Sequence, residues 1–315
     1  MTRRALILFL ALAGPAAAQT FEAVGSLAPE AALRGVTASP DGRQLAASCA
    51  DGRIRLYGLP GGGLQQTLET GAPRVSALAY SLGGTHLAAG TAAGGVRVFA
   101  LATGATVYDA AAAPLAIQSI ALSPDGSRLA IAPLDLPVQL WDVRSRQRIA
   151  DLPAEFAGAT AVAFSPDGAL LATSNGDTTV RIHHAATGRE VARFDELLLE
   201  PLALDFTPDS KTLVVGGADG VFTALDASTG KARSRSPRIP DPIGALAVLP
   251  GGKTAVAVTF LADSMDSPGN VVAWTLGAGL KTLASGLPVS GGGVGGGRLL
   301  LASPEGKTLK LWAVR

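Results

Sequence analysis

The chain has 315 residues, of which 39 are glycine and 20 are proline, a density that excludes a helical bundle or a long coiled coil. Hydrophobic residues make up 48% and charged residues 16%, which excludes a disordered chain. The 26 basic and 25 acidic residues are balanced and form no basic cluster, so the sequence lacks the electrostatic character of a nucleic-acid-binding protein.

The first 18 residues have the three parts of a secretory signal peptide. Arg3 and Arg4 form a charged start, an apolar run follows, and small residues precede Gln19. The apolar run is too short to cross a bilayer as a helix, and no later run is long and apolar enough. The sequence therefore predicts a signal peptide over 1–18 and an exported chain over 19–315 without a membrane span. We expect a periplasmic location, with full secretion as the alternative.

A 42-residue repeat organises the rest of the chain. The tetrapeptide Ser39-Pro40-Asp41-Gly42 recurs from Ser123 and from Ser165, and degenerate copies start at 81, 207 and 249. A second series occupies another position of the repeat: Asp51, Asp135, Asp177 and Asp219. A third series is Tyr57, Phe99, Trp141, His183 and Leu225. Three series that keep the same period indicate a true internal repeat.

Each repeat has the pattern of four short strands. In the fourth copy, apolar runs start at Ala161 and Leu170 on either side of a Ser-Pro-Asp-Gly turn. An alternating run follows at Val180, and a more polar run starts at Glu190. Hairpin turns between these runs predict one antiparallel sheet per repeat. Because such a sheet has two apolar faces, the sheets must stack, and a closed ring buries both faces.

The length of the chain after residue 18 corresponds to about seven repeats, with first turns near 39, 81, 123, 165, 207, 249 and 294. The sixth repeat is irregular, because Trp274 follows Leu225 by 49 residues, so we expect an insertion of seven residues around Leu261–Gly269. The seventh ends at Leu311–Arg315, its third strand. We predict that Phe21–Leu27 supplies the missing fourth strand and closes the ring.

The period, the Ser-Pro-Asp-Gly turns, the turn aspartates and Leu140-Trp141-Asp142 resemble the WD40-repeat family of β-propellers. The resemblance covers essentially all of 19–315. It implies an all-β fold, a seven-bladed β-propeller of four-stranded antiparallel blades whose ring is closed by an N-terminal strand.

The sequence offers little for catalysis or for metal binding, so we predict no catalytic residue, no cofactor and no metal. His183 and His184 are neighbours on a strand, so their side chains point to opposite faces and cannot bind one metal ion together. We expect His183 to pack between blades and His184 to be exposed in a turn. The single cysteine, Cys49, excludes an internal disulfide and a Cys-based zinc site, and we expect it to be buried.

Asp205 departs from its repeat. The equivalent residues on the innermost strand are all small: Thr37, Ala79, Ala121, Ala163 and Ala247. A carboxylate at this position faces the central channel or a blade interface, where it must find a partner or shift its pKa. A paired structural aspartate and a contact to a channel ligand are the two interpretations.

In propellers that this chain resembles, partners bind the face formed by the loops that follow strands four and two of each blade. The resemblance carries this role to Arg34, Arg74, Gln118, Glu200 and Asp241. We expect the insertion, with Asp263, Met265 and Asp266, and the loop Pro237–Pro242 on the same side. Small apolar residues with a few charges favour a protein partner, itself periplasmic, over a polyanion.

The leading hypothesis is a non-catalytic exported scaffold or docking subunit in the cell envelope, because the repeat architecture is complete and no catalytic constellation accompanies it. A propeller-type hydrolase or lactonase is an alternative. It requires a metal ion or a cluster of catalytic side chains in the channel, and Asp205 is the only residue that supports it. A propeller that binds a small molecule in its central channel is the other alternative.

Overall fold

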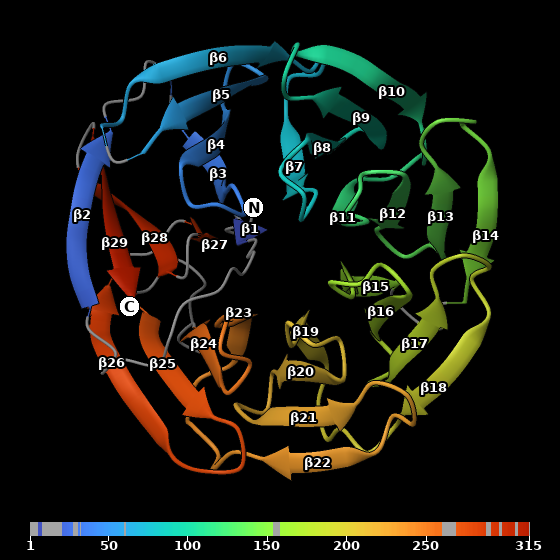
Figure 1. Ribbon diagram of the computed structural model, residues 1–315, viewed down its shortest axis with the longest axis vertical. Coiled ribbons are helices and arrows are strands. Elements are labelled where there is room, and N and C mark those ends of the chain that lie inside the picture. Colours follow the sequence, from blue (N-terminus) through green and yellow to red (C-terminus); the bar gives the residue numbers. More distant parts are fainter. Residues whose placement is uncertain are drawn as a thin grey trace.

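The computed structural model describes residues 6–7, 21–27, 31, 33–59, 61–153, 158–259, 269–287, 291–295, 298–305 and 308–314. These residues form strands and turns and no helix, which confirms the predicted all-β class. The sheets stand around a common axis (Figure 1). Six of them have four strands and one has five.

The first three sheets along the chain contain these strands: β3 (Leu33–Ala38), β4 (Gln44–Cys49), β5 (Arg53–Gly58) and β6 (Leu64–Glu69), with β1 (Leu6–Ile7) parallel to β3; β7 (Val75–Tyr80), β8 (His86–Thr91), β9 (Gly95–Ala100) and β10 (Ala105–Ala111); and β11 (Ile117–Leu122), β12 (Arg128–Pro133), β13 (Val138–Asp142) and β14 (Arg148–Leu152).

The next three sheets contain these strands: β15 (Ala159–Phe164), β16 (Leu170–Asn175), β17 (Val180–His184) and β18 (Glu190–Phe194); β19 (Pro201–Phe206), β20 (Thr212–Gly217), β21 (Phe222–Asp226) and β22 (Ala232–Arg235); and β23 (Ile243–Val248), β24 (Thr254–Thr259), β25 (Gly269–Thr275) and β26 (Leu280–Leu287).

The remaining sheet joins the two ends of the chain. It contains β27 (Gly291–Gly295), β28 (Arg298–Glu305), β29 (Thr308–Val314) and β2 (Phe21–Leu27). Strand β2 pairs antiparallel with β29 from Phe21 opposite Val314 to Leu27 opposite Leu309. The insertion expected around Leu261–Gly269 lies mainly in 260–268, between β24 and β25 and outside the described residues, together with Asp263, Met265 and Asp266.

The first turn of each repeat forms through the side chains that the sequence repeats. Ser39 Oγ donates to Asp41 Oδ1 at 2.6 Å, and Gly42 N–H donates to the Ser39 carbonyl at 2.9 Å. Gly42 has a φ of 67°, which a residue without Cβ adopts at no steric cost. The same Ser or Thr to Asp bond recurs at the turns starting at residues 123, 165 and 207, which confirms that one local chemistry sets these hairpins.

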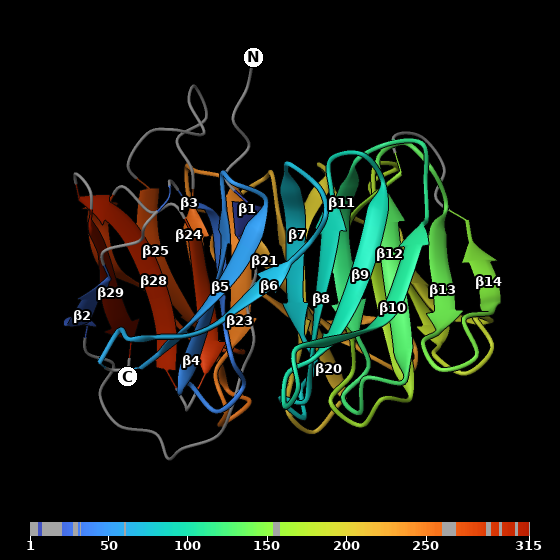
Figure 2. The same ribbon diagram turned by 90° about the horizontal axis from the view of Figure 1, so that it is seen from above.

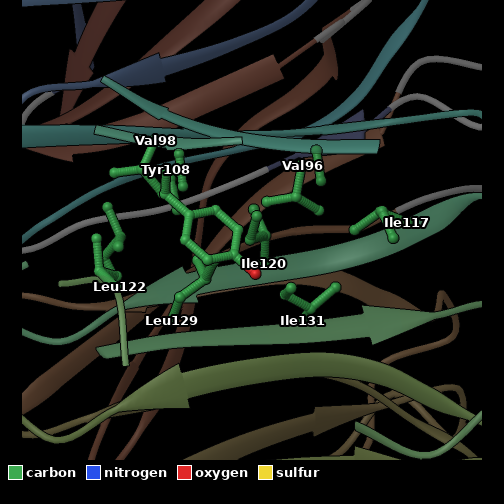
Figure 3. Close-up of a cluster of buried hydrophobic side chains, with 12 residues drawn as sticks. Val96, Val98, Tyr108, Ile117, Ile120, Leu122, Leu129 and Ile131 are labelled. Carbon is green, nitrogen blue, oxygen red and sulfur yellow. The ribbon is translucent and has the colours of Figure 1, made fainter. Parts of the chain in front are cut away.

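The core lies between neighbouring sheets, where side chains from the strands of one blade pack against those of the next. One cluster joins Val96, Val98 and Tyr108 of the sheet β7–β10 to Ile120 and Ile131 of the sheet β11–β14 (Figure 3). A second contact of this kind pairs two aromatic rings, since Trp274 on β25 stacks on Phe222 on β21 with ring centroids 5.7 Å apart. The sheets in these two contacts therefore depend on each other for the burial of their faces.

Two buried tyrosines in this core differ in one respect that stability measurements can resolve. Tyr108 is 1% exposed, and its hydroxyl finds no hydrogen-bond partner among the described residues. Tyr80 is 2% exposed, and its hydroxyl bonds to Gln44 Oε1 at 2.9 Å. We expect Tyr108→Phe to leave the free energy of unfolding unchanged or to raise it by about 1 kcal/mol, because it removes a buried polar group that has no partner. Urea unfolding measures this change.

Tyr80→Phe is the matched control. It removes the donor to Gln44 Oε1, so it should lower the free energy of unfolding by about 1 kcal/mol. Equal losses for both variants would contradict the assignment of the Tyr108 hydroxyl as a destabilising group.

Candidate interaction surface

Turns and loops gather on two opposite rims of the ring (Figure 2). We call one the hairpin rim: it contains the first and third turns of each repeat, which bond to one another, as Val143 N–H does to the Ser127 carbonyl at 2.9 Å. We call the other the loop rim: it contains the second turns and the loops that lead into the first strands. There Ala92 N–H donates to the Arg74 carbonyl at 3.0 Å, and Ala218 N–H donates to the Glu200 carbonyl at 2.9 Å.

The predicted partner-binding residues lie in these entry loops or at the starts of the first strands, and their accessibility differs. Arg34 and Arg74 are exposed, whereas Gln118 and Glu200 are half-buried. Asp241 is half-buried and engaged within the fold, since its Oδ2 accepts a hydrogen bond from Asn270 Nδ2 at 2.9 Å. The two arginines are therefore the most accessible members of the predicted set.

The loop rim also carries exposed leucines that the sequence reasoning did not single out. Leu198 is 81% exposed and Leu199 is 46% exposed, both in the loop from β18 to β19, and Leu115 is 40% exposed in the loop from β10 to β11. Among the described residues, the other large hydrophobic side chain with such exposure is Leu64, at the start of β6 on the hairpin rim. The sequence did contain a signal for this exposure. Leu197–Leu199 lie between Asp195, Glu196 and Glu200, and a leucine run inside an acidic loop has no sheet face against which to pack.

Asp205 is a half-buried residue of β19 that contacts the next sheet. Its Oδ2 accepts a hydrogen bond from the backbone N–H of Val248, at the end of β23, at 2.9 Å. Burial raises the pKa of Asp205 to about 7, and the hydrogen bonds from the Val248 and Phe206 N–H groups only partly offset it. Asp205 thus has a hydrogen-bond partner on the innermost strand of the adjacent blade, as the interpretation of a paired structural aspartate requires. A contact to a channel ligand stays a prediction.

Comparisons with known proteins agree with this geometry. The sequence model of the WD40 family, described as "WD domain, G-beta repeat", matches residues 21–58 and 147–184. No curated protein matches the sequence significantly. The β-propeller domain of Cps50 (Swd1) from Myceliophteria thermophila superimposes with a TM-score of 0.79 at 15% identity, covering 94% of this chain and all of that domain. The chain therefore contains sequences that match the WD40 repeat at these two positions and has the fold of a β-propeller. Because 1866 chains of solved structures match, the fold by itself does not select a function.

Blades of this propeller contain a buried ion pair that the sequence reasoning missed. On β17, Arg181 Nη2 lies 2.5 Å from Asp177 Oδ2, with side chains that are 1% and 10% exposed, and its Nη1 donates to the Pro153 carbonyl at 2.6 Å. Arg55 and Asp51 make the same pair at 2.8 Å in the first blade. The signal was present, since Arg55, Arg97 and Arg181 share one repeat position. These pairs tie the second turn to the third strand.

The remaining sequence candidates of the propeller have structural surroundings. His183 is buried and His184 is exposed, which confirms that they point to opposite faces. Burial lowers the pKa of His183, although the Gly188 carbonyl at 3.2 Å from its Nδ1 favours the charged form. Cys49 is buried at the end of β4, as predicted. Within the described part of the chain, no group of three or more His, Cys, Asp or Glu side chains could hold a metal ion.

A search of the described residues for membrane spans finds no helix long and apolar enough to cross a bilayer.

Proposed function

We propose that this WD40-repeat propeller is a non-catalytic scaffold that docks onto another protein through its loop rim. The exposed leucines Leu198 and Leu199 carry the proposal, because a large side chain that stays four-fifths in water at a loop tip gains about 2 kcal/mol when a partner covers it. The neighbouring charges Glu196 and Arg235, 2.9 Å apart, supply the polar border that protein interfaces have around their apolar centre.

The fold underlying the proposal is a ring of seven blades in which β2 serves as the fourth strand of the last blade. The antiparallel pairing of β2 with β29 supports it. The spacing of the two family matches also supports this arrangement, because they begin at residues 21 and 147, three repeat periods apart. The second match starts at the fourth strand of the third blade, β14, and the first match starts at β2, which supports an equivalent role for β2.

The location we propose is the periplasm, with full secretion as the alternative. Arg3, Arg4, the following apolar run and the small residues before Gln19 support export through a cleaved signal peptide. Cleavage there would remove β1, which pairs with only Gly35 and Val36 of β3, and would leave a four-stranded first blade.

Replacing both leucines by aspartate should abolish docking. Tagged protein recovered from its native envelope extract should bring one partner in stoichiometric amount, measured by quantitative mass spectrometry. The Leu198→Asp/Leu199→Asp variant should lose that partner by tenfold or more, because two charged side chains cannot enter an apolar pocket without a large desolvation cost. Charge reversal at Arg34 and Arg74 should weaken recovery less, since border charges contribute less than buried apolar contacts.

Leu64→Asp is the matched control, because Leu64 has the same 46% exposure as Leu199 but lies on the hairpin rim. It should retain the partner. Recovery of the propeller alone, or equal loss in both variants, would contradict docking through the loop rim.

A further inference from the structure

A groove opens on the hairpin rim between the second and third blades, on the opposite side of the ring from the docking leucines. It has a volume of about 420 Å³. Its floor is apolar, because Val107 and Val143 pack on the cluster that joins these two blades. Its walls are polar, and we call it the arginine groove, defined by His86, Thr106, Asp125, Ser127, Arg144 and Arg146.

Two arginines that line the arginine groove, Arg144 and Arg146, make no ion pair with a carboxylate of the described residues. In contrast, Arg97 and Arg148 of the same two blades are paired. Arg146 Nη2 makes one long hydrogen bond, 3.4 Å, to the Val107 carbonyl. The groove's own carboxylate, Asp125, accepts hydrogen bonds at its Oδ1 from Ser123 Oγ at 2.6 Å and from Ser127 Oγ at 2.8 Å.

The backbone of Arg146 is the second observation. Its φ is 59°, in the left-handed region that favours glycine. The equivalent positions in the third turns of other blades are glycines with φ between 70° and 72°: Gly62, Gly104, Gly188 and Gly230. A side chain with Cβ is disfavoured in this conformation. The chain therefore accepts local strain in one turn, and the residue in the strained conformation is one that lines the groove.

We propose that the arginine groove binds an oxyanion, the phosphate or carboxylate group of a small organic molecule. The two guanidiniums provide forked donors whose geometry matches the oxygens of such a group. Thr106 lies in the same lining and carries a hydroxyl that can act as a neutral donor, and the His86 ring packs against Gly126 beside it. The apolar floor accommodates the carbon skeleton of the ligand. This site lies apart from the loop rim and does not depend on the proposed docking function.

Thermal unfolding of the purified protein tests the site, with inorganic phosphate and succinate as probes at constant ionic strength set by chloride. The melting temperature should rise with the concentration of at least one probe, because a ligand that binds only the folded state stabilises it. A response to phosphate alone assigns phosphate esters as the ligand class, and a response to succinate includes carboxylates. Arg144→Gln should weaken the response about tenfold.

Arg146→Gly separates binding from folding. Glycine suits the turn, so this variant should unfold at an equal or higher temperature without ligand, yet lose the response to the anion. Arg189→Gln is the matched control, since Arg189 is an exposed residue of the third turn in the fourth blade and lies outside the groove. The proposal is overturned if neither anion stabilises the protein, or if the Arg146→Gly variant responds as strongly as the wild type.

Discussion

Arg181→Met should lower the free energy of unfolding by about 3–5 kcal/mol, because it leaves the Asp177 carboxylate almost buried without its cation. The Pro153 carbonyl loses its donor in the same step. Methionine retains most of the volume of the arginine stem, so the loss reports the broken charge pair more than a cavity. Urea unfolding followed by the fluorescence of the three tryptophans measures the effect.

Two further variants make the interpretation specific. Arg53→Met breaks an ion pair with Glu69 whose side chains are 49% and 68% exposed, and it should cost less than about 1 kcal/mol. Adding Asp177→Asn to Arg181→Met removes the uncompensated charge and should restore part of the stability. A loss below about 1 kcal/mol for Arg181→Met alone would show that the pair does not hold the blade together.

Asp205→Asn should stabilise the protein at neutral pH and have little effect at pH 4. The pKa of Asp205 is about 7 in the folded protein against 3.8 in the unfolded chain, so the folded state binds the proton more tightly. Between these values the unfolded chain loses its proton first, and the stability of the wild type falls as pH rises from about 4 to about 7. The asparagine does not titrate, and its oxygen still accepts the Val248 N–H. The gain over the wild type should therefore grow through this window to at most about 4 kcal/mol.

The difference in unfolding free energy between wild type and variant, measured from pH 4 to pH 8, isolates this residue from other titrating groups. Asp209→Asn in the same blade should act in the opposite direction. The hydrogen bond from Thr207 holds the pKa of Asp209 below its ordinary value, so the Asp209 charge stabilises the fold above pH 4 and its removal is destabilising at pH 7. A difference for Asp205→Asn that stays constant across the pH range would refute the burial argument.

The sequence allowed much of the fold to be predicted because one local chemistry is repeated. Ser39, Asp41 and Gly42 close their turn through contacts within the tetrapeptide, and the period carried that turn to the other blades. Position within the repeat also predicted the burial of His183 and Cys49, since a register position determines which face a side chain takes. The number of blades and the closure of the ring stay predictions that the pairing of β2 supports.

The candidate sites were harder to predict because they depend on departures from the repeat and on contacts between distant residues. Asp205 stood out against its small equivalents, but its partner Val248 belongs to another blade. Leu198 lies in an inter-blade loop, where no period fixes exposure. The arginine groove needs Thr106 from one blade beside Arg146 from the next, a contact that the repeat does not predict. The strained φ of Arg146 did have a sequence signal, because an arginine stands where the repeat has glycine.

The sheet that contains both β2 and β29 has a consequence for the order of folding. Strand β2 comes before β3–β26 in the chain and β29 comes after them, so this sheet cannot assemble until the strands of the other sheets have been synthesised. Blades in the middle of the chain consist of consecutive strands and need no such wait. The slowest step of folding is therefore expected at the join between the ends of the chain, where contact order is highest. Once β29 has been synthesised, its outer edge stays unpaired until β2 pairs with it.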